Sequence, residues 1–391
     1  FGSEPDMLNV FVPKESRPGE RRVAATPDSV KRLLKAGLAV QVEREAGFAA
    51  GIPDDAYAKA GATVAAHATD LWRHADIVLK VAPLGSNPSL GIMELEALKP
   101  GAVLIGFLDP FNLPVVRRYA ERRITAVSME LVPRITRAQV MDALSSQASV
   151  AGYRAVLIAA TRVGKYFPLM TTAAGTVTPA RVVVLGAGVA GLQAVATARR
   201  LGAVVEVSDI RPAVKEQVES LGGRFIDLPL EESGEGSGGY ARELSKAGLE
   251  RQREVLTRHL AQADVVITTA QVPGKRAPIL VTTAMAEQMK PGAVIVDIAA
   301  EQGGNCELTR ADETVEHRGL LVLGPTNLAA GMAGDASVLY ARNVAALLLH
   351  FVRDGELAID PADEVLAGAL LTHQGEVINR TVAGLLAASR G

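Results

Sequence analysis

The order of apolar and polar positions divides the chain into short strands and longer helices. Short apolar runs rich in valine, leucine and isoleucine, bounded by glycine, proline or charged residues, are typical of buried strands. Between them, apolar residues return at helical spacing. Strands that alternate with helices predict parallel α/β sheets. The predicted strands cover residues 9–12, 39–42, 77–81, 103–107, 124–128, 181–185, 204–207, 265–268, 294–298 and 320–323. The predicted shorter helices cover residues 27–36, 54–60, 114–122, 361–371 and 377–388.

Two long helical patterns, at residues 136–162 and 336–351, indicate how the domains are connected. We expect the first to bridge two domains and the second to return the chain to the first domain. Residues 164–178 and 327–334 lack this pattern and are expected to be irregular. The sequence therefore predicts two Rossmann-like, doubly wound parallel-sheet domains joined by long helices. The predicted domains are an N-terminal α/β domain of residues 7–135 plus 336–391, and a nucleotide-binding domain with its connecting helix, residues 136–335.

A glycine fingerprint directly follows the predicted strand at residues 181–185. Gly186 permits a tight turn, Gly188 lets backbone approach a pyrophosphate, and Gly191 lets the next helix pack closely on the strand. A second strand ends at Asp209, about 20 residues beyond Gly186, where an acid can bind a ribose hydroxyl. This order favours dinucleotide binding over a purely structural glycine turn. The residues expected to hold the cofactor here are Gly186, Gly188, Val189, Ala190, Gly191, Asp209, Ile210 and Arg211.

Composition narrows the possible functions. A chain of 391 residues favours two domains over a single core. With 41 basic and 43 acidic residues, it shows no sign of binding nucleic acid or an anionic membrane. A single cysteine, Cys306, excludes an internal disulfide and fits a reducing compartment; it is either a plain structural cysteine or a reactive one. No apolar run reaches the roughly 20 residues of a membrane span. The six histidines are scattered, and no cluster has metal-ligand spacing.

Two polar segments can carry chemistry. Residues 230–240 are rich in glycine and serine and end in Tyr240, so they form either a solvated linker or a lid over a ligand. Gln139, Asp142 and Ser145 lie at helical spacing, which can place them on one face of the first long helix. The alternative is an exposed polar face at a helix start, with Thr136 as the N-cap.

Four stretches together resemble a known family. They are residues 13–15 with 20–27, residues 134–147, residues 186–192 with 209–211, and residues 236–242 with 272–275. The chain resembles the NAD(H)-binding component (domain I) of proton-translocating NAD(P) transhydrogenase, and also alanine dehydrogenases. The resemblance implies that Arg134, Gln139, Asp142 and Ser145 surround the nicotinamide ring, with Tyr240 closing over it. It further assigns Gly239 and Gln252 to the bound nucleotide.

The transhydrogenase resemblance implies partners and a location. NAD(H) would bind here, while NADP(H) and the proton pathway would belong to nucleotide-binding and membrane-spanning partner subunits. The chain would be a homodimer at the cytoplasmic face of the membrane. Hydride transfer between two nicotinamides needs positioned rings and dry surroundings, but no acid, base or metal.

Two other functions remain open. In the alanine dehydrogenase interpretation, the resemblance assigns Lys80 to the substrate and expects a proton-carrying histidine just after the strand at residues 103–107. Asp109 stands in that region and no histidine does, which counts against amino-acid oxidation. The third possibility is a non-catalytic NAD-responsive binding module.

Overall fold

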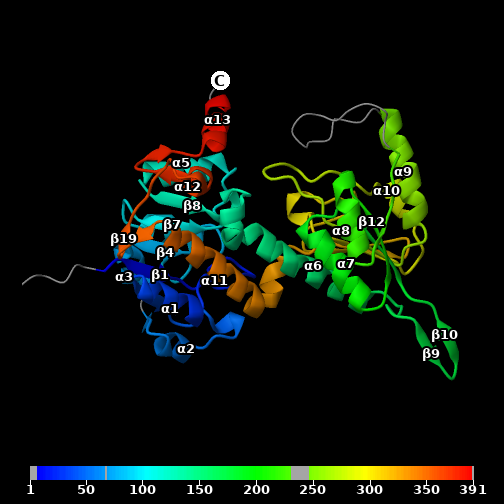
Figure 1. Ribbon diagram of the computed structural model, residues 1–391, viewed down its shortest axis with the longest axis horizontal. Coiled ribbons are helices and arrows are strands. Elements are labelled where there is room, and N and C mark those ends of the chain that lie inside the picture. The colour runs from blue at the N-terminus through cyan, green and yellow to red at the C-terminus, as the bar shows by residue number, and fades with distance from the viewer. Residues whose placement is uncertain (1–6, 67, 230–245, 390–391) are drawn as a thin grey trace, which may run out of the picture. The chain divides into compact units, whose positions relative to one another are not determined.

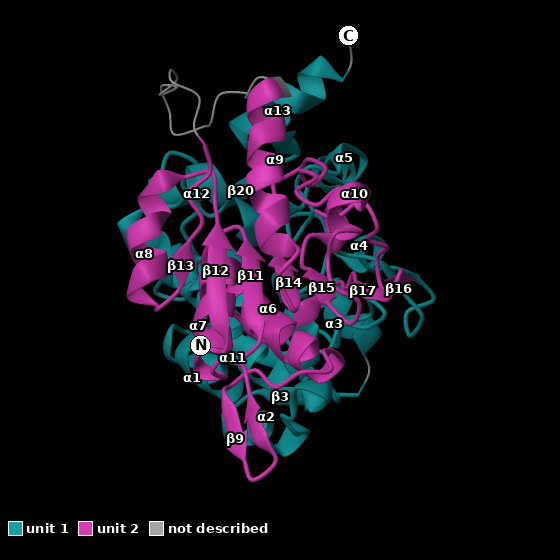
Figure 2. Ribbon diagram, turned by 90° about the vertical axis from the view of Figure 1, so that its right-hand side faces the viewer, with its two compact units in different colours: residues 1–147, 329–391 teal, residues 148–328 magenta. Residues whose placement is uncertain are grey.

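The computed structural model of the protein describes residues 7–66, 68–229 and 246–389. The chain forms two compact units, drawn in different colours in Figure 2. Unit 1 comprises Phe1–Gln147 and Ala329–Gly391, and unit 2 comprises Ala148–Leu328. Gly239 and Tyr240 of the sequence prediction lie outside the described residues.

Unit 1 is built on an eight-stranded sheet in the order β21-β20-β8-β7-β4-β1-β2-β3. Six strands run parallel, and β20 and β21 add an antiparallel edge. The strands are β1 (Asn9–Val12), β2 (Ala39–Glu43), β3 (Thr63–Ala65), β4 (Ile77–Leu79), β7 (Val103–Gly106), β8 (Thr125–Ser128), β20 (Leu370–His373) and β21 (Glu376–Val377). The helices are α1 (Pro27–Lys35), α2 (Asp54–Lys59), α3 (Ala68–His74), α4 (Glu94–Ala97), α5 (Leu113–Glu121), α11 (Ala333–His350), α12 (Glu364–Ala369) and α13 (Arg380–Ala388). Two small antiparallel pairs are β5 (Ser86–Asn87) with β6 (Ile92–Met93), and β18 (Val352–Arg353) with β19 (Glu356–Leu357).

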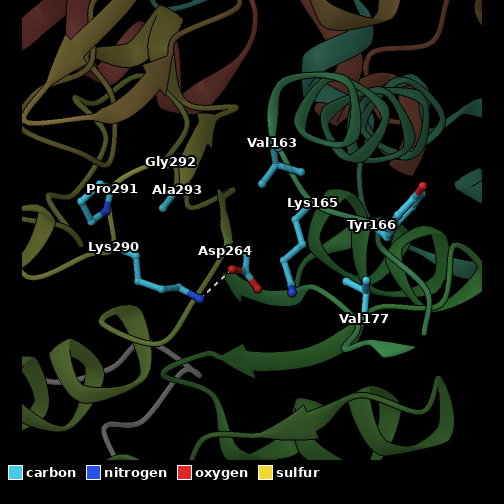
Figure 3. A pocket seen from close by; sticks show the side chains of 10 residues that line it. Val163, Lys165, Tyr166, Val177, Asp264, Lys290, Pro291, Gly292 and Ala293 are labelled. Atoms are coloured by element: carbon cyan, nitrogen blue, oxygen red, sulfur yellow. Dashed lines mark hydrogen bonds and ion pairs between the residues drawn. The ribbon is translucent and has the colours of Figure 1, made fainter. Parts of the chain in front are cut away.

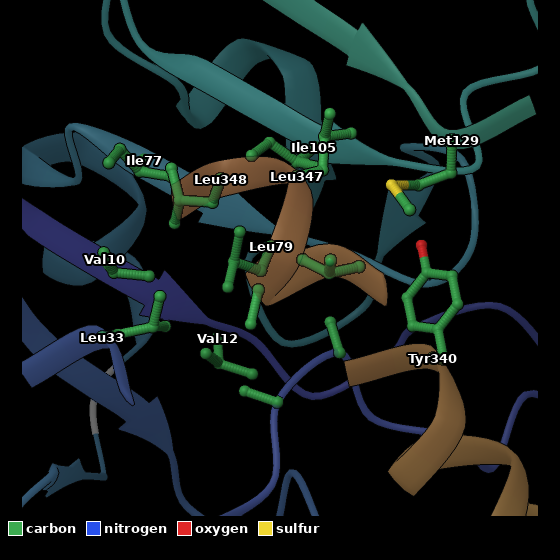
Figure 4. Close-up of a cluster of buried hydrophobic side chains, with 14 of the residues drawn as sticks. Val10, Val12, Leu33, Ile77, Leu79, Ile105, Met129, Tyr340, Leu347 and Leu348 are labelled. Atoms are coloured by element: carbon green, nitrogen blue, oxygen red, sulfur yellow. The ribbon is translucent and has the colours of Figure 1, made fainter. Parts of the chain in front are cut away.

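The core of unit 1 explains why α11 belongs to it. Valine, leucine and isoleucine side chains on β1, β4 and β7 pack against Leu33 of α1 and against Leu347 and Leu348 of α11 (Figure 4). Leu33, Leu347 and Leu348 are fully buried. The second long helical pattern therefore has an apolar face because it covers this sheet.

Unit 2 is built on a seven-stranded sheet in the order β13-β12-β11-β14-β15-β17-β16, which Figure 2 shows side by side. All neighbours are parallel except β16 and β17. The strands are β11 (Arg181–Leu185), β12 (Val204–Ser208), β13 (Arg224–Phe225), β14 (Val265–Thr268), β15 (Val294–Asp297), β16 (Thr314–His317) and β17 (Leu320–Leu323). The helices are α7 (Val189–Arg200), α8 (Lys215–Ser220), α9 (Lys246–Leu260) and α10 (Thr283–Ala286), and α6 (Ala143–Arg162) enters from unit 1.

Both sheets place their parallel strands in the order third, second, first, fourth, fifth, sixth, which is the Rossmann order. The predicted α/β class with two doubly wound, mainly parallel sheets is confirmed.

Three local predictions were wrong. Residues 136–162 are not one helix: a 3-10 helix, Thr136–Met141, precedes α6, and Ile135, not Thr136, is its N-cap. Residues 164–178 contain a hairpin of β9 (Met170–Thr172) and β10 (Gly175–Val177), visible in Figure 1. Residues 361–371 and 377–388 are not purely helical, because β20 and β21 take the open edge beside β8, where their backbone groups find partners.

Candidate functional site

The glycine turn lies where the strand order of unit 2 reverses, at the carboxyl end of β11. Gly186 has a left-handed φ of +103° and donates its N–H to Ser208 O at 2.8 Å. A side chain there would come within 2.5 Å of Thr269 Oγ1. A Cβ on Gly191 would meet Gly186 O at 1.8 Å, so only glycine lets α7 start this close to β11. A Cβ on Gly188 would meet nothing within 4 Å, which leaves open space beside this backbone.

The start of α7 can accept an anion in that open space. Gly188 is its N-cap, and Val189 and Ala190 form the beginning of its first turn. The first backbone N–H groups of a helix have no acceptor inside the helix, and the helix dipole favours negative charge there. The residues present therefore fit the pyrophosphate of a dinucleotide.

Asp209 follows β12 and is held by its neighbours. Its carboxylate accepts from Ala187 N at 2.7 Å, Arg211 N at 2.8 Å, and the Arg211 guanidinium at 3.0 and 3.1 Å. Burial opposes ionisation, but these bonds outweigh it and hold the pKa of Asp209 below its usual value. Arg211 is thus engaged by the acid, and Ile210 between them is exposed.

The polar residues at 134–145 line one cavity of about 260 Å³ in unit 1. Arg134 and Gln139 are exposed. Asp142 accepts from Ser145 N at 2.9 Å and from Ser145 Oγ at 2.5 Å, which caps the start of α6. The prediction that these side chains share a helical face was wrong, because Asp142 lies between two helices with a ψ of 85°. The four residues nevertheless meet at one cavity.

The predicted site residues therefore fall into two groups. The glycine turn and Asp209 belong to unit 2, and Arg134, Gln139, Asp142 and Ser145 belong to unit 1. Gln252 lies on α9, where its Nε2 donates to Pro229 O at 3.1 Å. Its assignment to the nucleotide stays a prediction.

Sequence reasoning missed a buried network beside the glycine turn. Asn305, fully buried, donates to Ala270 O and Pro278 O, each at 2.8 Å, and accepts from Ala270 N at 3.0 Å. The buried Asp297 at the end of β15 accepts from Asn305 N at 2.7 Å. Because Thr269 touches the Gly186 backbone, this network fixes the segment against the glycine turn. The available signal was the Gly303-Gly304-Asn305 run just after a predicted strand.

A larger cavity of about 690 Å³ lies at the opposite edge of the same sheet (Figure 3). Asp264 and Ala293, which line it, directly precede β14 and β15. Lys290 approaches Asp264 from the loop before β15, with an Nζ–Oδ1 distance of 2.6 Å. Ligands of doubly wound sheets bind at the carboxyl ends of the strands, so this cavity is not the dinucleotide site.

Lys80 is enclosed by acids rather than open to a substrate. Its ammonium lies 2.8 Å from Glu15 and 3.3 Å from Glu94, and its side chain is fully buried. Burial disfavours the charge, but the two carboxylates outweigh it and raise the pKa of Lys80. Asp109 has a φ of +52°, and Glu130 accepts from its backbone N–H at 2.9 Å.

Other catalytic chemistry finds little support in the described part of the chain. No group of three histidine, cysteine or acidic residues there has metal-binding geometry. Burial raises the pKa of Cys306 to about 11, so its thiol is protonated at neutral pH. Among the described helices, none has the length and hydrophobicity to cross a membrane.

Comparison with known proteins places this geometry in a family. The model of the "alanine dehydrogenase/PNT, C-terminal domain" matches residues 155–380, and the model of the N-terminal domain matches residues 11–151. The chain belongs to the alanine dehydrogenase/PNT family. The predicted family resemblance is confirmed.

Within the alanine dehydrogenase/PNT family, similarity is greater to transhydrogenase subunits than to an alanine dehydrogenase. The first of the polypeptides that make up the NAD(P) transhydrogenase alpha subunit of Rhodospirillum rubrum is 47% identical over 383 residues, covering 96% of this chain and 99% of the relative. Alanine dehydrogenase 1 of Staphylococcus aureus is 28% identical over 385 residues, covering 96% and 95%. The crystal structure of transhydrogenase from Sinorhizobium meliloti matches with a TM-score of 0.85 at 45% identity, covering 95% of this chain and 100% of that one.

Proposed function

We propose that the chain is the NAD(H)-binding component of a proton-translocating NAD(P) transhydrogenase of the Re/Si-specific type. It would exchange hydride with NADP(H) bound on a partner subunit. The observation that carries this proposal is the 47% identity to a transhydrogenase subunit along nearly the whole of both chains. The open glycine turn before α7 and the ionised Asp209 supply a matching site for the nucleotide.

The chain's residues would bind and orient rather than donate protons. The backbone N–H groups of Val189 and Ala190 would hold the pyrophosphate, and Asp209 would accept from the adenosine ribose. Arg134, Asp142 and Ser145 would orient the nicotinamide, and Gln139 would contact the partner's nucleotide. When bound, NADH supplies the hydride. The bonds from Ser145 keep the Asp142 carboxylate in one position, so the orienting group is already fixed.

Gln139 is the sharpest test, because its side chain is exposed and shows no hydrogen bond within the described chain. Gln139→Asn shortens the side chain by one methylene but keeps the amide. Displacement by about 1 Å can slow transfer roughly 100-fold. We expect single-turnover transfer from NADH to partner-bound NADP⁺ to fall by more than about tenfold, with the NADH dissociation constant unchanged.

The matched comparison is Asp142→Asn, which should change both quantities because Asp142 also caps α6. Transfer by Gln139→Asn at the wild-type rate would remove Gln139 from the contact between nucleotides. Loss of NADH binding in that variant would instead place Gln139 at the local cofactor.

Partner subunits and location belong to the same proposal. The NADP(H) site and the membrane helices would be contributed by other subunits, with this chain as a homodimer at the cytoplasmic face. Co-purification with membranes that contain those subunits, and its loss when they are removed, tests the location. Light scattering of the purified chain tests the dimer.

A further inference from the structure

A second cavity of unit 2, of about 450 Å³, is not used by the proposed function. It is formed by the loop after β14 and the segment after β15. None of its lining residues belongs to the glycine turn, to the Asp209 segment or to the stretch at residues 134–145. Its lining residues are Arg276, Ala277, Ile279, Gly303, Cys306, Glu307, Thr309 and Arg310.

Arg276 is held at this cavity without an ion-pair partner. No carboxylate among the described residues lies within salt-bridge distance of it. The next residue, Ala277, is buried and donates its N–H to Gln302 O at 2.8 Å, which anchors the loop. Gly303 has a φ of +94°, and a Cβ there would meet Arg276 Nε at 3.0 Å and Cγ at 3.1 Å. A glycine at this position therefore leaves room for the arginine to lie along the backbone.

Arg310 brings a second guanidinium to the same cavity. Its Nη1 donates to Thr309 O at 2.9 Å and to Glu307 O at 3.3 Å, which orients the planar group. Its other N–H groups bond to no residue in the described ranges. The Glu307 carboxylate accepts from Thr283 N at 2.6 Å, and this bond lowers the pKa of Glu307. Two arginines against one glutamate leave the lining with a net positive charge.

We propose that this cavity binds a phosphomonoester. A phosphate group offers three terminal oxygens, which two guanidiniums can share through parallel N–H···O bonds, whereas a carboxylate offers two. The cavity is many times larger than the roughly 30 Å³ of one water, so it has room for an organic body beside the phosphate. The buried side chains of Ala277 and Cys306 provide an apolar wall for that body. The site is distinct from the dinucleotide turn, and the inference does not rest on the proposed function.

The test is a calorimetric titration of the full chain with glycerol 3-phosphate, with NADH at saturation so that the glycine turn is occupied. We expect saturable binding that Arg276→Ala weakens by about tenfold or more, the loss of one charge-assisted contact. Glu307→Gln should tighten binding, because it removes the only carboxylate of the lining. Inorganic phosphate should bind more weakly than the ester, and acetate more weakly still.

Arg200→Ala is the matched control, because Arg200 is an exposed arginine of the same unit at the end of α7. It should bind the ester as the wild type does. The melting temperature of each variant checks folding. Equal affinity of wild type and Arg276→Ala, absence of saturation, or competition between the ester and NADH would each overturn the proposal. Equal affinity for inorganic phosphate and the ester would overturn the claim that concerns the organic body.

Discussion

Asn305 pairs with Ala270 through two reciprocal hydrogen bonds, 35 residues apart in the chain. The side-chain amide of Asn305 takes both backbone polar groups of Ala270, in the way that a neighbouring strand would. Asp297 in turn holds the backbone of Asn305, and all of Asn305 is buried. The segment that contacts the glycine turn is thus fixed by a side chain rather than by the sheet.

Asn305→Ala should therefore lower both stability and nucleotide affinity. The substitution leaves the N–H and C=O of Ala270 without their partner, and each unpaired buried group costs about 1–3 kcal/mol. We expect a loss in this range in urea unfolding and weaker NADH binding by calorimetry. Gln271→Ala, which removes a neighbouring exposed amide, should change stability by less than about 0.5 kcal/mol. Equal effects of the two variants would contradict the role of Asn305.

Asp209 should select NAD(H) over NADP(H). Its ionised carboxylate repels a 2′-phosphate, and its bonds to Arg211 keep that arginine from receiving the phosphate. Calorimetric titration should give a lower dissociation constant for NADH than for NADPH, and Asp209→Asn should narrow the difference. Tighter binding of NADPH by the wild type would refute this.

The lowered pKa of Asp209 also sets a pH dependence. A carboxyl whose folded pKa lies below its unfolded value adds stability above the unfolded value and loses it as pH falls through the folded one. The Asp209 contribution to NADH affinity should therefore be constant from neutral pH down to about 5, and decline only at lower pH. A decline centred near pH 6 would point to a different group.

Sequence patterns predicted much of this molecule because the relevant interactions are local. The valine-rich run of β11 is buried on both faces, and the glycines after it are needed by contacts within one turn. Asp142 was mistaken for a helical residue because helical sequence flanks it on both sides, whereas its side chain caps α6. The strand β20 was missed because four apolar-rich residues fit a helix equally well until the edge of β8 is known. The pairing of Asn305 depends on a distant partner, which one sequence cannot show.

Lys80→Met should strongly destabilise the protein. The change keeps most of the side-chain volume but leaves Glu15 and Glu94 buried without their cation. Breaking a buried ion pair by removing one partner costs about 3–5 kcal/mol. Lys99→Met is the control, because Lys99 pairs with Asp76 in a partly exposed position and should cost less than about 1 kcal/mol. Similar unfolding free energies for the two variants would show that the acids do not depend on Lys80.

The same burial of Lys80 predicts that restoring a histidine will not create an alanine dehydrogenase. Asp109→His places an imidazole in the loop where the family resemblance expects a proton carrier. Histidine tolerates the positive φ of this position better than most residues, and Glu130 continues to hold the loop backbone. A carboxylate substrate would still have to displace Glu15 and Glu94 from the lysine that should bind it, at the cost of leaving buried charges unpaired. With alanine and NAD⁺, the wild type and Asp109→His should both form NADH no faster than a blank, while NADH binding stays unchanged. NADH formation by Asp109→His alone, with matching pyruvate, would show that Lys80 is available to a substrate and that the missing histidine was the only barrier.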